Sequence, residues 1–146
     1  MDQIKIRSPK SKKEWEKYDE FRWDILRKPL KMSHVPLKDN LEDCSYHFMA
    51  ISRSKNILAC GRVHMNNEYE AQIRYMGVSN NVRRMGIGSS MVKRLEEKAK
   101  ILGATYVSLN ARNVALDFYK SLGYIEIEPY ESDIKIPHTR MEKKLT

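Results

Sequence analysis

Residues 83–89 combine residue types that bind phosphate. They read RRMGIGS and lie between an apolar run and the start of a helical pattern. A helix N-terminus has unpaired N–H groups and the positive end of the helix dipole, so it attracts anions. Gly86 and Gly88 would let the backbone approach an anion closely and adopt positive φ. Arg83 and Arg84 add charge and forked donors. The stretch therefore predicts a diphosphate site.

Two common phosphate loops fit this stretch poorly. A Walker loop places a lysine after its last glycine, whereas Gly88 is followed by two serines. A dinucleotide-binding fingerprint needs a third glycine, where this chain has Met91, and an acidic residue near the end of the next strand, where TYVSLNAR has none. It also starts from a parallel unit, and here an antiparallel meander precedes the helix. The first loop is excluded, and the second is only weakly supported.

A third pattern, Arg/Gln-x-x-Gly-x-Gly/Ala, fits residues 83–88. With this motif the chain resembles the GNAT superfamily of acetyl-coenzyme A-dependent N-acetyltransferases. The motif follows an apolar strand that ends at Val78 and opens an amphipathic helix, and the run AxxFYxxLGY at residues 115–124 resembles the family's second signature. Residues 21–30 and 136–141 further resemble a bacterial subgroup similar to the ElaA type.

The resemblance implies an α/β (α+β) protein with the GNAT fold. This is a mixed, mostly antiparallel sheet, flanked by helices and splayed between strand four, near residues 70–78, and strand five, near 105–109. The pantetheine arm of acetyl-coenzyme A would lie in that gap as a pseudo-strand, and the N–H groups of residues 84–89 would hold its pyrophosphate. Lys120 or Arg112 could meet the 3′-phosphate. The residues expected to bind this co-substrate are Met76, Gly77, Val78, Arg83, Arg84, Met85, Gly86, Ile87, Gly88, Ser89, Asn113 and Tyr119.

The reaction implied by the resemblance is direct attack of a neutral primary amine on the thioester, through a tetrahedral intermediate. A free alkyl amine is mostly protonated at neutral pH, so a base or water must take its proton. The family places its usual general acid, a tyrosine, on the helix after strand five, where this chain has Tyr119. The N–H of Val78 would stabilise the oxyanion, an effect worth about 3 kcal/mol per donor. No general base can be named from the sequence.

One position departs from the family pattern. Seven residues before Tyr119, where many members have Asn, this chain has Arg112, and Asn113 follows it. The resemblance therefore does not settle whether the side chain at this position contacts the co-substrate. Asn113, one residue later, could serve only as a helix cap.

Each assignment also has a purely structural alternative. The two glycines of the motif could serve a tight turn, and Tyr119 could belong to the core. We interpret His64 and His138 as strand residues rather than bases. Glu68 and Glu70 are interpreted as solvated hairpin charges, with the alternative that one of them handles the substrate amine. The acidic residues at positions 126, 128, 131 and 133 could attract a cationic amine if they border the acceptor cleft, but a solvated strand face is slightly favoured.

Composition limits the remaining classes of protein. The 146 residues predict one domain, residues 1–146, and contain no 18-residue apolar stretch or signal-peptide core, so we expect a cytoplasmic protein without a membrane partner. The net charge of +8 is interspersed with acidic residues and forms no basic tail, which argues against nucleic acid. Cys44 and Cys60 lack metal-ligand spacing, so both are expected to be reduced and no metal is expected.

Hydrophobic periodicity predicts elements in the order β, α, (α), β, β, β, α, β, α, β, β. Ser11 and Glu14 form a capping box for a helix that ends before Pro29, and residues 30–45 are irregular or form a short second helix. The strands are expected at 4–7, 46–52, 57–65, 71–78, 105–109, 124–128 and 134–145, and a short helix at 115–122.

Two functions remain open at this stage. The first is an N-acetyltransferase that uses acetyl-coenzyme A and a small amine or peptide amine. The second is a sensor of the same fold that binds an acyl-coenzyme A without transferring its acyl group. A homodimer is compatible with either.

Overall fold

The computed structural model describes residues 3–31, 36, 38–83, 85–132 and 134–146. In these residues seven strands form one sheet in the order β1-β2-β3-β4-β5-β7-β6. All neighbouring strands are antiparallel except β4 and β5, which are parallel. The predicted mixed, mostly antiparallel sheet is therefore confirmed. The strands are β1 (Ile4–Arg7), β2 (Tyr46–Ser52), β3 (Ile57–Met65), β4 (Glu70–Val78), β5 (Tyr106–Arg112), β6 (Ile125–Tyr130) and β7 (His138–Lys144).

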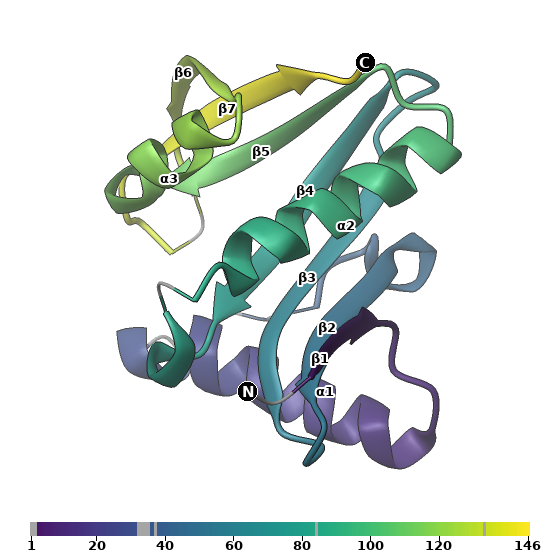
Figure 1. Cartoon of the computed structure of the whole chain (residues 1–146). Helices are drawn as coiled ribbons and strands as arrows, with labels where there is room; N and C mark the ends of the chain where they lie inside the picture. The colour runs from purple at the N-terminus through teal and green to yellow at the C-terminus, as the bar shows by residue number, and fades with distance from the viewer. Residues whose placement is uncertain (1–2, 32–35, 37, 84, 133) are drawn as a thin grey trace.

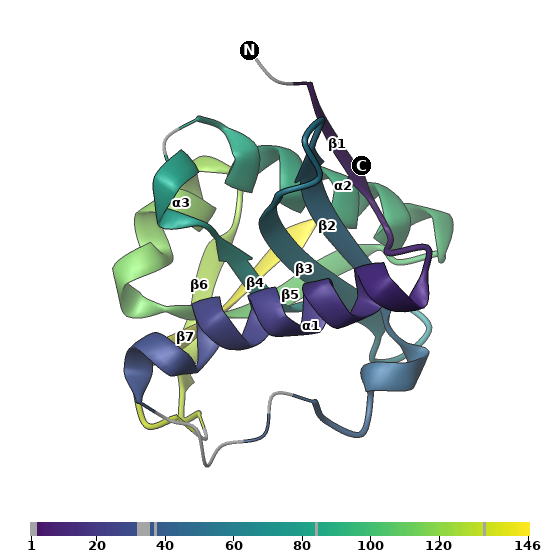
Figure 2. The same ribbon diagram turned by 90° about the horizontal axis from the view of Figure 1, so that it is seen from below.

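Helices cover both faces of the sheet (Figures 1 and 2). On one face lies α1 (Lys12–Leu26), and on the other lie α2 (Ile87–Ile101) and the short α3 (Leu116–Ser121). The alternation of side chains along the strands builds the two layers. Met49, Ile51 and Cys60 pack with Tyr18 of α1, whereas the residues beside them in β2 and β3 pack into the larger core under α2.

The first helix begins as the capping-box pattern predicts. The Ser11 side chain accepts a hydrogen bond from the N–H of Glu14, 3.1 Å away. The Glu14 carboxylate turns back to the N–H of Lys10 and pairs with Arg7 of β1. These contacts fix the start of α1 against the edge of the sheet, and its far end reaches the part of β4 that forms the site described below.

Strands β4 and β5 pair over only part of their length. Their register covers four pairs, from Glu70 opposite Tyr106 to Ile73 opposite Leu109. Beyond these pairs the strands separate, as Figure 1 shows. On the β3 side the register of β4 also shifts here, and Tyr75 adopts a positive φ of 53°. Such a bulge bends the strand and increases its twist, which turns the end of β4 away from β5.

The predicted element order is confirmed, with differences at the ends of elements. The strand expected at 105–109 runs on to Arg112, because residues 110–112 pair with β7. That pairing partner lies far along the chain, so local pattern does not reveal it. Within residues 30–45, only part of which is described, one 3₁₀ turn (Lys28–Leu30) overlaps the start and another (Glu42–Cys44) lies at the end.

Other expectations concern what the chain lacks. No helix within the described residues is long and apolar enough to cross a membrane. In the same part of the chain, no group of three or more His, Cys, Asp or Glu side chains could hold a metal ion. Cys44 is exposed, Cys60 is buried, and both are free thiols.

Candidate active site

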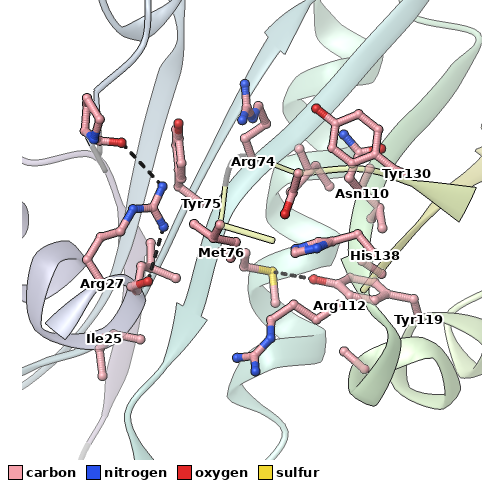
Figure 3. A pocket seen from close by; sticks show the side chains of 18 residues that line it. Ile25, Arg27, Arg74, Tyr75, Met76, Asn110, Arg112, Tyr119, Tyr130 and His138 are labelled. Atoms are coloured by element: carbon pink, nitrogen blue, oxygen red, sulfur yellow. Dashed lines mark hydrogen bonds between the residues drawn. The ribbon is translucent and has the colours of Figure 1, made fainter. Parts of the chain in front are cut away.

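A cavity of about 240 Å³ lies where β4 and β5 separate (Figure 3). The end of α1 and the bulged part of β4 form one side of it, with Arg27 and Tyr75. The opposite side carries Tyr119 of α3 together with Tyr130 and His138 of the last two strands. The cavity thus exists because the sheet opens, and it brings Tyr119 close to β4.

Tyr119 faces this cavity. It packs edge-on against Phe118 and Tyr124, with ring centroids 4.9 and 5.8 Å away. Its hydroxyl lies 3.9 Å from the sulfur of Met76, a weak contact across the gap between α3 and β4. Burial raises the pKa of Tyr119 to about 12, so the hydroxyl keeps its proton throughout the physiological range.

The backbone of β4 leaves the N–H of Val78 on the open side of the strand. The N–H of Ser79 donates to the carbonyl of Leu58 at the start of β3, 2.8 Å away. In an antiparallel ladder successive N–H groups point to opposite sides, so the N–H of Val78, opposite Ala59, points away from β3. The β5 partner that would take this N–H is missing, because pairing with β5 stops at Ile73.

Gly77 has a packing role in this segment. A Cβ at this position would lie 2.6 Å from Cγ2 of Ile25 and 3.2 Å from Cδ2 of Leu26. Such contacts are too short for any side chain, so only glycine lets α1 pack this closely on β4. Met76, by contrast, lines the cavity.

The turn into α2 has the features expected of an anion site. Gly86 is the N-cap residue with φ of 79°, no side chain caps the helix, and a Cβ on Gly86 would meet nothing within 4 Å. Gly88 differs, because a Cβ there would lie 3.2 Å from Cζ of Phe118. Ile87 is buried in the core, whereas Arg83 and Met85 are exposed. Ser89 is half-buried, and Arg84 lies outside the described residues.

Asn113 is not a helix cap. Its side-chain oxygen accepts a hydrogen bond from Thr139 Oγ1, 2.7 Å away, and its N–H donates to the carbonyl of Pro137. The side-chain oxygen of Asn113 is therefore bound to β7, and no described side chain caps the following turn or α3. The alternative that Asn113 is a helix cap is wrong. Arg112, one residue earlier, is exposed at the edge of the cavity.

The expectation that Glu70 is a solvated hairpin charge is also wrong. Glu70 is 8% exposed and accepts hydrogen bonds from Ser108, Asn66, Arg140 and Tyr106. Burial by itself would raise the pKa of this carboxyl, but these donors outweigh burial and lower the pKa to about 2. Glu70 binds β4 to β5 and β7 at the closed end of the sheet, away from the cavity. Glu68 is exposed, as expected.

His64 and His138 both lie in strands, as interpreted from the sequence. His64 is fully buried next to Asn66, and burial and nearby Arg62 lower its pKa. His138 lines the cavity and donates from Nδ1 to the carbonyl of Ile136. Of the acidic residues near the C-terminus, Glu126 and Glu128 lie on the exposed strand β6, and Asp133 lies outside the described residues.

Sequence reasoning did not find the arginine-rich wall of the cavity. Four guanidinium groups surround the ring of Tyr75, with centroid distances of 5.7 Å for Arg22, 5.6 Å for Arg27, and 4.9 Å for both Arg62 and Arg74. The sequence offers one signal for this wall: Arg22 falls on the buried stripe of α1, where a charged residue requires partners.

A mixed sheet that opens between two parallel strands, next to a glycine turn that starts a helix, defines the GNAT fold. Residues 11–124 match the acetyltransferase (GNAT) family, and the chain belongs to that family of N-acetyltransferases. It is 34% identical over 118 residues to the uncharacterized N-acetyltransferase YjcF of Bacillus subtilis (strain 168). The aligned region covers 78% of this chain and 83% of YjcF.

Solved structures share the whole fold. ElaA of Escherichia coli superposes with a TM-score of 0.75 at 19% identity, over 99% of this chain and 100% of that chain. A GNAT family acetyltransferase from Elizabethkingia anophelis, with acetyl-CoA bound, superposes with a TM-score of 0.71 at 15% identity, over 99% and 98% of the two chains. At these identities the likeness supports the fold alone, so membership of an ElaA-type subgroup stays a prediction.

Proposed function

We propose that this chain transfers an acetyl group from acetyl-coenzyme A to a primary amine of a small molecule or peptide. The observation that carries this proposal is the opening between β4 and β5, where Tyr119 and Met76 line one cavity and the unpaired side of β4 continues from Met76 to Val78. A thioester placed along this open side of β4 would lie between the backbone N–H of Val78 and the hydroxyl of Tyr119.

Two segments of the described chain suit the pyrophosphate and the pantetheine arm of the co-substrate. The uncapped start of α2 offers N–H groups to a pyrophosphate, and Gly86 leaves space beside them. The unpaired side of β4 from Met76 to Val78 offers backbone groups to an extended pantetheine arm. When bound, acetyl-coenzyme A supplies the activated acetyl group as a thioester. Arg83, exposed before the helix, adds positive charge near the phosphates.

Two groups of the chain would assist the transfer. The amine nitrogen forms a bond to the thioester carbonyl carbon, the carbon–sulfur bond breaks, and the amine proton leaves through water or a base. The N–H of Val78 stabilises the negative charge on the carbonyl oxygen. Tyr119, the general acid, donates to the departing sulfur. Because a thiol has a pKa of about 8.5, full proton transfer from a hydroxyl of pKa about 12 is uphill, so hydrogen bonding as the bond breaks is the main contribution.

Calorimetric titration with acetyl-coenzyme A tests the proposal, together with an assay for free thiol across a broad panel of amines. We expect binding and amine-dependent thiol release in the wild-type protein. The double variant Arg83→Glu/Gly86→Glu should lose binding, because it puts negative charge at the phosphate site and strains a residue with positive φ. Arg53→Glu, on an exposed turn, is the matched control and should bind normally.

The two measurements separate the failures. An absence of heat with acetyl-coenzyme A would contradict the proposal altogether. Normal affinity without thiol release from any amine would instead show an acyl-coenzyme A sensor.

A further inference from the structure

The wall of the cavity next to α1 carries positive charge. Arg27, Arg74 and Arg112 line the cavity, whereas none of its described lining residues is Asp or Glu. Arg22 and Arg62 lie behind Tyr75 and are fully buried. The cavity therefore faces several guanidinium groups and no described carboxylate.

Nearby carboxylates neutralise this wall only in part. Glu42 forms two hydrogen bonds with Arg22 and one with Arg62, at 2.7 to 3.0 Å. A single oxygen of Asp39, Oδ2, accepts from both Arg62 and Arg74, each at 2.8 Å. Asp19 is shared between Arg22 and Lys38. Four cations, Arg22, Arg62, Arg74 and Lys38, share these three carboxylates, so this set of side chains has a net positive charge.

Arg74 is the member of this cluster best placed to bind a ligand. Its side chain is 32% exposed and lines the cavity, and its only described carboxylate partner is the shared oxygen of Asp39. The ring of Tyr75, 4.9 Å away, supports its guanidinium. A planar guanidinium with unused N–H groups matches the geometry of a carboxylate or a phosphate.

These arginines lie on the opposite face of the sheet from the expected pyrophosphate site. Arg74 and Arg62 are register partners whose side chains meet Asp39 on the α1 face. The glycine turn opens α2, which covers the other face (Figure 2). The phosphates of the co-substrate therefore do not explain the arginine wall, and its position at the cavity assigns it to the second substrate.

We propose, building on the proposed function, that the acetyl acceptor is an amine carrying a carboxylate or phosphate group, which Arg74 binds. The positive wall also disfavours a protonated amine, because like charges oppose ionisation. An anionic group attracts the acceptor while its amine is held in the neutral form that attacks the thioester. A polyamine has no anionic group that Arg74 could bind.

This inference argues against the alternative, less favoured from the sequence, of a cationic acceptor drawn to the acidic residues near the C-terminus. Glu126 and Glu128 project from the exposed strand β6, and Glu126 is paired with Lys120. Neither residue lines the cavity. The solvated-face interpretation therefore suits these two residues better.

The test uses wild-type protein, acetyl-coenzyme A and pairs of amines that differ only in an anionic group. Examples are phenylalanine with its methyl ester, and phosphoethanolamine with ethanolamine, and spermidine serves as the polycation. We expect the highest kcat/KM for an anionic amine, about 10- to 100-fold above its neutral partner. Arg74→Gln should remove this preference while leaving the affinity for acetyl-coenzyme A unchanged, and Arg74→Lys should retain part of it. Arg53→Gln should retain all of it.

The outcomes distinguish this inference from the function on which it rests. Acetylation of neutral or cationic amines in preference to anionic ones would overturn the inference alone. Binding of acetyl-coenzyme A without transfer to any amine would overturn the proposed function and the inference together. Because the wild-type panel decides the preference, the test does not depend on the folding of any variant.

Discussion

The two ends of the β4–β5 pair differ more than any other two regions of the sheet. At one end, four register pairs and the buried carboxylate of Glu70 bind β4, β5 and β7 together. At the other end, the bulge at Tyr75 turns β4 away, and a cavity lined by Tyr119 and arginine side chains takes the place of the ladder.

The contacts at the closed end offset the loss of β4–β5 hydrogen bonds at the open end. An open sheet edge leaves N–H groups without partners, and here the same two strands are secured by a carboxylate with four donors. The hydrogen bonds that β4 does not form with β5 are then available to an extended ligand. A substitution at the open end should change the reaction, whereas a substitution at the closed end should change the stability of the fold.

The largest effect is expected at the open end. Tyr119→Phe should lower kcat by about 100- to 1,000-fold, the usual effect of removing one hydrogen-bond donor to a developing negative charge. The affinity for acetyl-coenzyme A should hardly change, because the hydroxyl has only a weak contact with Met76. Steady-state thiol release and calorimetry measure the two quantities. Tyr69→Phe, at an exposed hairpin position, is the matched control. A kcat close to that of the wild type would remove Tyr119 from the mechanism.

At the closed end, Glu70→Ala should lower the free energy of unfolding by about 3 kcal/mol, because it leaves Arg140 and Ser108 without their buried partner. Urea unfolding measures this loss. The exposed neighbour Glu68 provides the control, and Glu68→Ala should change little. If both variants have similar stability, Glu70 does not secure the closed end.

A smaller effect concerns pH. The pKa of Glu70 is lowered to about 2 in the folded chain, against about 4.3 when unfolded. This carboxylate therefore stabilises the fold above the unfolded pKa, and the stabilisation is lost as pH falls toward the folded pKa. As the pH falls from about 5 to about 3, the free energy of unfolding of Glu70→Gln should decrease by about 1–2 kcal/mol less than that of the wild type.

Glu14 provides an internal reference for this experiment. Hydrogen bonds from Arg7 and Lys10 also lower its pKa to about 2, and it is present in both proteins. Its contribution therefore cancels in the comparison. Parallel pH profiles for the two proteins would contradict the role given to Glu70.

Local patterns predict the elements and their order along the chain, because hydrophobic periodicity is a short-range property. The family resemblance adds the mixed sheet and the place of Tyr119 on the helix after strand five. Neither predicts the environment of Glu70, whose partners Ser108 and Arg140 lie 38 and 70 residues away. Nor do they predict the arginine wall, because Asp39 comes from a segment without periodicity and meets Arg74 only in the folded chain. Long-range pairing of charges is decided by packing.

The central claim is that the open end of β4 and β5 receives acetyl-coenzyme A. Amide chemical shifts measured by NMR during a titration with this compound test it directly. We predict large changes at Val78 and at the start of α2, around Gly86, and almost none at Ala71 and Val107 in the closed end. Equal changes at both ends, or changes confined to the closed end, would contradict the account.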